Sequence, residues 1–328
     1  MIARPAFIRE PQNPILSAKD WPYPVNAVFN PGVTRLPDGR VLLLCRCEDF
    51  RGHSHFTKAI SEDGIQGWVI DPEPTFAPDF LKYPEELWGV EDPRITRMDD
   101  DGTYIVSYTA FSRKGPGISI FTTQDWVTFD RCGLIMRPDD KDGAVFPKRF
   151  GGRYAMIHRP SREGGADMWL SYGTDLLHWG ESERWMKARS GAWWDARKIG
   201  LCGPPIETPE GWLVFYHGVR QHASGSIYRV GAALFELENP SRAIARGDEW
   251  LMGPEEPYEL VGDVGSVIFP CGNVLEDNGD TISLYYGGAD TSISMARCSL
   301  SEVVRYLKNS EQTYSLELST RYHEDVTS

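Results

Sequence analysis

The chain has 328 residues, of which 41% are hydrophobic and 25% are charged, as is ordinary for a globular protein that buries a core. Its formal net charge of −13 argues against a nucleic-acid partner or an anionic membrane surface, because both require a basic face. No run of about 18 apolar residues occurs, so the sequence predicts no membrane-spanning helix.

One phrase recurs five times along the chain: an apolar stretch built around proline, a turn that contains glycine, and two further strands. It starts near residues 30, 92, 146, 204 and 269. A unit of several short strands that repeats at such a period is typical of propeller blades. We therefore expect an all-β protein, a five-bladed β-propeller with a short C-terminal helix, as a single domain over residues 1–328.

The remaining elements follow in chain order. Residues 1–25 are expected to supply a strand that closes the ring, and residues 301–307 have helical spacing and cap the last blade. The other strands are predicted at 41–46, 55–60 and 68–70; 104–108, 117–121 and 127–129; 154–158, 168–172 and near 179; 212–216 and 228–237; 282–286 and 293–297. We interpret the aromatic residues Trp68, Phe129 and Trp179 as blade core.

Six cysteines lie at positions 45, 47, 132, 202, 271 and 298, without a C-x-x-C pair. A metal site or a disulfide is one interpretation, but free thiols buried as small apolar side chains are favoured. No cluster of His, Cys and Asp has the spacing of metal ligands, so we expect no metal cofactor. The N-terminal residues lack an apolar signal core, which together with the cysteines predicts a cytoplasmic location.

Propeller geometry predicts which residues meet at one end of the central channel. The start of an innermost strand lies beside the end of the second strand, because the two form an antiparallel hairpin, and the third strand returns to the same end. The residues expected at this end are Asn30, Arg46, Asp92, Lys141, Asp142, Arg159, Lys198, His217, Tyr228 and Asp290. Although distant in sequence, they are predicted to form one site.

Cations dominate this predicted ring in a strongly acidic protein. They are Arg46, Lys141, Arg159, Lys198 and His217. Like charges that face one cavity repel one another and lose solvation, which a bound anion would relieve, and Arg with Lys forms a natural phosphate site. The alternative is that each cation pairs with a neighbouring carboxylate such as Asp142, Asp195 or Glu207.

Carboxylates share the ring with aromatic side chains. Asp92 and Asp290, near aromatic residues such as Tyr228, suit sugar hydroxyls and the protonation of a glycosidic oxygen, although an Asp-Pro pair also caps a strand start. Inverting hydrolysis needs a second carboxylate to activate water, whereas phosphorolysis needs only a phosphate held opposite the leaving group. A cluster of cations around one acid therefore favours glycosyl transfer to phosphate.

Eight short segments carry a resemblance to a known family. They are N-P-G (30–32), C-R-C-E-D (45–49), W-G-V-E-D-P-R (88–94), I-H-R-P (157–160), K-I-G (198–200), Y-H-G-V (216–219), F-P-C-G (269–272) and Y-G-G-A-D (286–290). As an ordered set, over about residues 10–305, they resemble the β-mannoside phosphorylases of glycoside hydrolase family 130. The resemblance implies a five-bladed β-propeller, in agreement with the repeat.

The resemblance also implies roles for the ring residues. Asp92 corresponds to the family's proton donor, which acts through the 3-hydroxyl of the bound mannose while phosphate attacks C1 from the opposite face. The phosphate contacts carry over to Arg159, Lys198, His217, Tyr228 and Lys141. The mannose contacts carry over to Asn30, Arg46 and Asp290, with Arg51 near the leaving sugar. The implied product is α-mannose 1-phosphate, formed with inversion.

We therefore expect an inverting phosphorylase that acts on β-mannosides, foremost on short β-1,4-mannooligosaccharides, with inorganic phosphate as co-substrate and no cofactor. The set of phosphate residues favours this over a β-mannosidase on the same fold and over a sugar-binding propeller without catalysis. Residues 221–226 are expected to shape the side of the leaving sugar, whose identity and linkage stay open. The N-terminal arm and the helix at 303–307 suit an interface between copies of the chain as well as a solvated edge.

Overall fold

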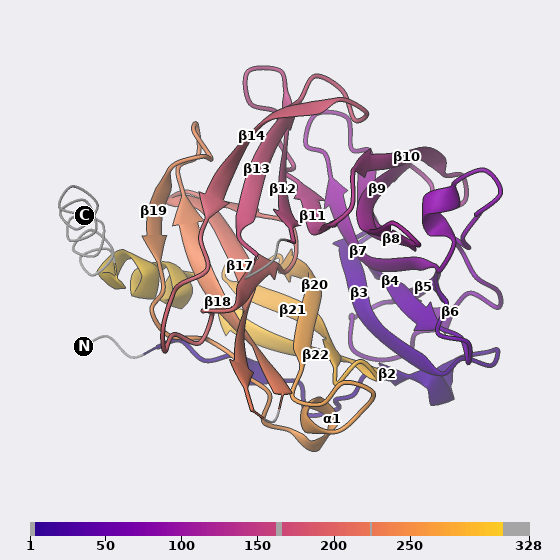
Figure 1. The fold of residues 1–328 in the computed structure, drawn as a ribbon. Helices are drawn as coiled ribbons and strands as arrows, with labels where there is room; N and C mark the ends of the chain where they lie inside the picture. Colours follow the sequence, from indigo (N-terminus) through magenta and orange to yellow (C-terminus); the bar gives the residue numbers. More distant parts are fainter. Residues whose placement is uncertain (1–3, 162–165, 224, 311–328) are drawn as a thin grey trace.

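The computed structural model describes residues 4–161, 166–223 and 225–310. In this part of the chain the strands form five antiparallel sheets, the blades, around a common axis (Figure 1). Helical turns are short, apart from the helix at residues 300–310. The fold is thus the five-bladed β-propeller that the repeat predicts. None of the helices described here is long and apolar enough to cross a bilayer.

Each blade is a sheet whose strands pair in order from the axis outward. Blade one contains β3 (Ala27–Arg35), β4 (Val41–Glu48), β5 (Ser54–Ser61) and β6 (Val69–Ile70). Blade two contains β7 (Val90–Arg97), β8 (Tyr104–Ser112), β9 (Gly115–Thr123) and β10 (Asp130–Met136). Blade three contains β11 (Asp140–Val145), β12 (Tyr154–Pro160), β13 (Met168–Gly173) and β14 (Trp179–Met186).

The last two blades carry additional short strands. Blade four contains β15 (Lys198–Leu201), β17 (Gly211–His222), β18 (Gly225–Phe235) and β19 (Ala243–Arg246), and β16 (Ile206–Thr208) also pairs with β17. Blade five contains β20 (Ile268–Leu275), β21 (Thr281–Gly288) and β22 (Ser292–Ser299), with β1 (Ile8–Arg9) and β2 (Leu16–Ser17) at its outer edge. The short helix α1 (Pro257–Leu260) precedes β20.

The continuous apolar run of β4 shows why a sheet of this sequence becomes a blade. Its side chains alternate between two faces, and both faces are buried. Leu43 packs into a core shared with blade five, and Leu44 packs into a core shared with blade two. Full burial of such a side chain contributes roughly 1.5–3 kcal/mol. Each blade is therefore held between its two neighbours.

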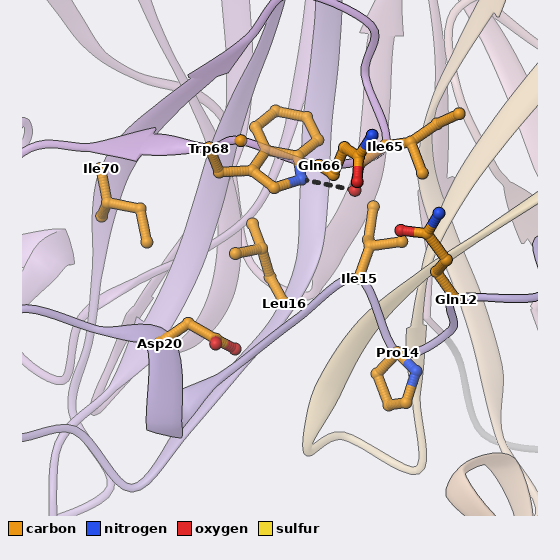
Figure 2. A pocket seen from close by; sticks show the side chains of 10 residues that line it. Gln12, Pro14, Ile15, Leu16, Asp20, Ile65, Gln66, Trp68 and Ile70 are labelled. Carbon is orange, nitrogen blue, oxygen red and sulfur yellow. Dashed lines mark hydrogen bonds between the residues drawn. The ribbon is translucent and has the colours of Figure 1, made fainter.

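The N-terminal segment closes the ring as the sequence predicts, because β1 and β2 both pair with β22 of the last blade. Between them the side-chain amide of Asn13 exchanges two hydrogen bonds with the backbone of Met295, at 2.8 and 2.9 Å, and so continues the sheet. A pocket of about 360 Å³ lies where this segment meets blade one. Figure 2 shows Leu16 of the segment facing Trp68 of blade one there.

The helix at residues 300–310 packs Val303 and Leu307 into the core between blades four and five. The predicted helix that caps the last blade is therefore present. Trp68, Phe129 and Trp179 pack against the blade cores, in agreement with their interpretation. Residues 311–328 lie outside the part that the structure describes.

Two inner strands begin earlier than the repeat indicates. In blades three and four they start at Asp140 and Lys198 rather than near 146 and 204. Pro31, Pro93 and Pro270 lie inside inner strands, at shifts of register. Residues 147 and 205 are also proline but follow the inner strands. The proline phrase therefore marks a bulge inside the inner strand in three blades and a loop after it in two.

Candidate active site

A β-bulge with a positive φ angle recurs near the start of three inner strands, and each bulge carries a polar side chain. Asn30, Asp92 and Asp142 occupy equivalent bulges in blades one, two and three, with φ of 46°, 52° and 58°. Asn and Asp are the side chains that best tolerate this left-handed region. Strained positions of this kind concentrate at functional sites. The three bulges therefore mark one end of the propeller as the candidate site.

The first half of the site, which we call the carboxylate side, consists of Asn30, Arg46, Asp92 and Asp290 from blades one, two and five. Asp92 is 2% exposed, and its Oδ1 accepts hydrogen bonds from Asn30 Nδ2 and Arg46 Nη1, both at 2.9 Å. A second ion pair joins Arg46 Nη2 to Glu91 at 3.1 Å. The positive charge of Arg46 is thus compensated within the protein.

The two aspartates of the carboxylate side titrate in opposite directions. Burial alone would raise the pKa of Asp92, but the positive charges of Arg46, Lys141 and Arg94 hold that pKa below its ordinary value. Burial, together with the negative charge of Asp92, raises the pKa of Asp290 to about 6. Asp92 is therefore ionised near neutral pH, whereas Asp290 takes up a proton as the pH falls to about 6.

The second half, which we call the cation side, consists of Lys141, Asp142, Arg159, Lys198, His217 and Tyr228 from blades three and four. Arg159 Nε donates to Asp142 Oδ2 at 2.7 Å, and His217 Nε2 lies 3.5 Å from the same oxygen. Gly200 permits this approach, because a side chain there would collide with both Asp142 and His217. Asp142 is 1% exposed and lies at the centre of the group.

The lysines of the cation side differ from its arginine, which pairs directly with Asp142. Within residues 4–161, 166–223 and 225–310, no carboxylate lies in ion-pairing distance of Lys141 or Lys198. Lys198 Nζ instead lies 5.1 Å from the ring centroid of Tyr228. Burial, with Arg159 nearby, lowers the pKa of Lys198 to about 8. An anion bound here would restore an ordinary ammonium.

His217 is fully buried beneath this group. Its ring lies 4.7 Å from the ring of Phe269 and 5.9 Å from that of Tyr228. Burial lowers the pKa of His217 to about 3 in spite of the nearby Asp142 carboxylate. The imidazole is therefore neutral, and it can donate or accept a hydrogen bond but adds no charge.

Asp142 is ionised although it is as deeply buried as His217. Burial would raise the pKa of Asp142, but the positive charges of Arg159 and Arg94 hold that pKa well below its ordinary value. A single buried carboxylate thus offsets part of the positive charge on this side.

A buried arginine that the sequence analysis did not select joins the two halves. Arg94 is 1% exposed and donates to the backbone carbonyls of Asp92, Leu201 and Cys202, at 3.0, 2.8 and 2.7 Å. Its Nη2 also lies 3.5 Å from Asp142 Oδ1. Arg94 therefore ties blade two to blade four directly beneath the site. The Glu-Asp-Pro-Arg segment contains it, but no local pattern shows where its side chain reaches.

The structure brings the predicted ring residues together, and Arg51, expected near the leaving sugar, lies outside them. Its side chain is 77% exposed and pairs with Asp49 at 2.6 Å, so it lies at the surface of the loop after β4. Pairing with carboxylates, the alternative for the cations, holds for Arg46 and Arg159. The other two suggested partners, Asp195 and Glu207, pair elsewhere, with Arg246 and Lys148.

Asp142 was predicted at this end of the channel, but with no role beyond that of a counter-charge to the cations. Its equivalence to Asp92 is visible in sequence, since each follows a charged residue and precedes a residue that suits a bulge, Gly143 or Pro93. No group of three or more His, Cys, Asp or Glu suited to a metal occurs in the part of the chain that the structure describes. All six cysteines are free.

Comparison with known proteins identifies the family to which this propeller belongs. A family model for glycoside hydrolase family 130, described as beta-1,4-mannooligosaccharide phosphorylase, matches residues 2–309. A beta-1,4-mannooligosaccharide phosphorylase of Ruminococcus albus is 34% identical, covering 90% of this chain and 89% of its own. A 1,2-beta-oligomannan phosphorylase of Thermoanaerobacter sp. is also 34% identical, covering 84% of this chain and 91% of its own.

A solved structure agrees with these matches. The beta-1,2-mannobiose phosphorylase of Listeria innocua, in complex with beta-1,2-mannobiose, superposes with a TM-score of 0.83 and 28% identity, covering 92% of this chain and 99% of that one. The fold and the matches together define a carbohydrate-active propeller enzyme. The chain belongs to glycoside hydrolase family 130, as the ordered motifs predict.

Proposed function

We propose that this enzyme cleaves β-mannosides by phosphorolysis and releases α-mannose 1-phosphate. The main support is the cation side, where Lys141 and Lys198 lack carboxylate partners among the described residues while Arg159 lies beside them. A doubly charged oxyanion compensates such a cluster, whereas water does not. The relatives support the same reaction class, since they are named as phosphorylases of β-linked mannosides.

In the proposed reaction each half of the site has a separate task. The carboxylate side binds the mannose, through Asn30, Arg46 and Asp290, and supplies the proton from Asp92. The cation side holds phosphate through Arg159, Lys198, His217, Tyr228 and Lys141. A phosphate oxygen forms a bond to C1 as the bond from C1 to the glycosidic oxygen breaks, which inverts the configuration at C1. The leaving oxygen takes its proton from the mannose 3-hydroxyl, which in turn takes the proton of Asp92.

The pKa of Asp92 makes the order of binding important. In the free site the surrounding cations keep Asp92 ionised, and an ionised carboxylate cannot act as an acid. Bound phosphate neutralises the charge of Lys141, one of those cations, and adds negative charge of its own, so it raises the pKa of Asp92. Phosphate is therefore both the nucleophile and the condition that lets Asp92 carry a proton.

For the substrate we propose short β-1,4-mannooligosaccharides. The family description and the Ruminococcus albus relative support this linkage, whereas the Thermoanaerobacter and Listeria relatives are named for β-1,2 linkages. In this proposal Arg51, exposed beyond the carboxylate side, and the hairpin at residues 221–226, in which Ser224 lies outside the described part, border the leaving sugar. A panel of β-1,4- and β-1,2-mannobiose, each with phosphate, tests the linkage.

Hydrolysis is the second candidate, because one related structure supports it. A protein that superposes with a TM-score of 0.79 and 28% identity, covering 90% of this chain and 94% of that one, is described with glycoside hydrolases of family 130 that target beta-1,2 mannosidic linkages. Incubation of mannobiose with and without phosphate separates the two reactions. Mannose 1-phosphate that forms only with phosphate supports phosphorolysis, and equal release of free mannose in both samples contradicts it.

A further inference from the structure

Blade three contains a chain of hydrogen bonds that crosses all four of its strands, from the buried Asp140 to the exposed Ser182. His158 on β12 bonds through Nδ1 to Asp140 Oδ2 at 2.7 Å and through Nε2 to Ser171 Oγ at 2.8 Å. Ser171 on β13 continues the chain to Ser182 Oγ on β14 at 2.6 Å. Asp140, His158 and Ser171 are 5%, 4% and 0% exposed. The chain runs from the outer strand of the blade to its inner strand.

The arrangement of Asp140, His158 and Ser171 matches the order of a carboxylate, imidazole and hydroxyl in a nucleophilic triad. A nucleophile must be reachable by its substrate, and Ser171 is fully buried and already shares its hydroxyl with Ser182. The geometry therefore points to a fixed support rather than to a second reaction centre.

The inner end of the chain meets the cation side. The second oxygen of Asp140, Oδ1, accepts a hydrogen bond from the backbone N–H of Arg159 at 3.1 Å. His158 and Arg159 are consecutive on β12, so their side chains point to opposite faces of the sheet. Asp140 thus holds both neighbours at once: His158 by its ring and Arg159 by its backbone.

The hydrogen-bond chain ends at Asp140, beside the bulge of the inner strand β11. Lys141 pairs with Arg159 across the β11–β12 ladder, and the register then shifts before Ala144. Within this shift Asp142 has a φ of 58° and receives Arg159 Nε at 2.7 Å. A strained bulge keeps its shape only when its surroundings fix it. Asp140, two residues before Asp142, supplies such a fixed point.

We propose that the chain of Asp140, His158, Ser171 and Ser182 is a positioning device for Arg159 and thereby sets the affinity of the enzyme for inorganic phosphate. The proposal rests on the phosphate role of Arg159 given above. In the proposed binding mode Arg159 contacts the phosphate and the members of the chain do not, so they are positioning residues. When the chain is cut, the guanidinium loses its fixed place beside Asp142, while the carboxylate side in blades one, two and five keeps its contacts.

The test compares His158→Phe with Tyr108→Phe. Both variants remove a buried side-chain hydrogen bond to a carboxylate, and Tyr108 bonds to Glu86 at 2.7 Å in blade two. We expect His158→Phe to raise the KM for phosphate about tenfold, with the KM for mannobiose changed less than about twofold. Tyr108→Phe is expected to lower Tm without changing either KM. Asp140→Asn and Ser171→Ala, with the same expected split, replace His158→Phe if that variant does not fold.

Two results would overturn the proposal. One is an unchanged phosphate KM in the variants of the chain, and the other is an equal rise in both KM values. Calorimetric titration of inorganic phosphate into wild type and variants gives a second measurement that needs no turnover. A wild type that binds phosphate but forms no mannose 1-phosphate refutes the proposed function alone, whereas equal phosphate affinity in wild type and His158→Phe refutes the positioning role alone.

Discussion

The two halves of the candidate site solve the problem of buried charge in different ways. On the carboxylate side, Asp92 and Glu91 both pair with Arg46, so the arginine is compensated without a ligand. On the cation side one carboxylate, Asp142, faces several basic side chains, and the pKa of Lys198 falls to about 8. The difference teaches that the arginine of the first half is paired within the protein, whereas the second half is arranged as the proposed phosphate site requires.

Removal of the proposed acid, Asp92, tests the role of the carboxylate side and should have the largest effect on activity. Asp92→Asn keeps the shape of the side chain but cannot supply a proton, so kcat for mannobiose phosphorolysis should fall about 10²–10⁴-fold. Glu91→Gln is the matched control, because it removes the other carboxylate that pairs with Arg46, and we expect less than a tenfold loss. Steady-state assays of mannose 1-phosphate check both. Asp92→Asn within tenfold of wild type would show that the proton comes from elsewhere.

Removal of one cation tests the other half. Arg159→Ala should raise the KM for phosphate about 10–100-fold, because a charge-assisted hydrogen bond contributes about 1.5–3 kcal/mol, while the KM for mannobiose changes little. Arg153→Ala is the control on the same blade, since Arg153 pairs with Glu181 at the surface. Initial rates over a matrix of both substrates separate the two KM values. A change confined to the mannobiose KM would contradict the division of tasks.

The lowered pKa of Lys198 predicts a pH dependence of phosphate use that belongs to the cation side alone. Above pH 8 the free enzyme loses the ammonium charge, so kcat/KM for phosphate should fall up to about tenfold per pH unit. Lys198→Arg keeps its charge in this range, and its profile should stay flat to pH 9 or beyond. Rates at limiting phosphate between pH 6 and 9.5 measure this. Parallel profiles for the two enzymes would rule out Lys198 as the titrating group.

The smallest expected effect is on stability and concerns Asp290. Its folded pKa of about 6 lies above the ordinary value, so the stability that its neutral form contributes is complete at pH 4 and is lost as the pH rises through 6. Asp290→Asn avoids the buried charge and should raise the free energy of unfolding by roughly 1–3 kcal/mol at pH 8, but not at pH 4. Thermal unfolding at both pH values checks the sign. A variant less stable than wild type at pH 8 would refute it.

The sequence predicts the fold well because the patterns that form strands and turns lie within each blade and repeat from one blade to the next. The hairpin rule also brings Asn30 and Arg46 to Asp92, and Arg159 to Asp142, before any coordinates are known. It succeeds because antiparallel pairing fixes which ends meet, whatever the length of the intervening loops.

Three features of the structure could not be predicted from the sequence, each for a physical reason. Arg94 acts through carbonyls 107 and 108 residues away, so nothing near it in sequence indicates its partners. The starts of blades three and four were misplaced because proline marks a bulge in three blades and a loop in two. Arg51 was expected beside the leaving sugar, but whether a long, exposed side chain bends inward depends on the ligand.

The way in which the chain ends meet has a consequence for biosynthesis. Asn13 bonds to Met295, 282 residues later, so the earliest strands have no partner until the final blade has left the ribosome. Contacts this distant form late and slowly. Only then does the blade that carries Asp290 meet the blade that carries Asn30. A nascent chain should therefore be inactive until blade five has left the ribosome.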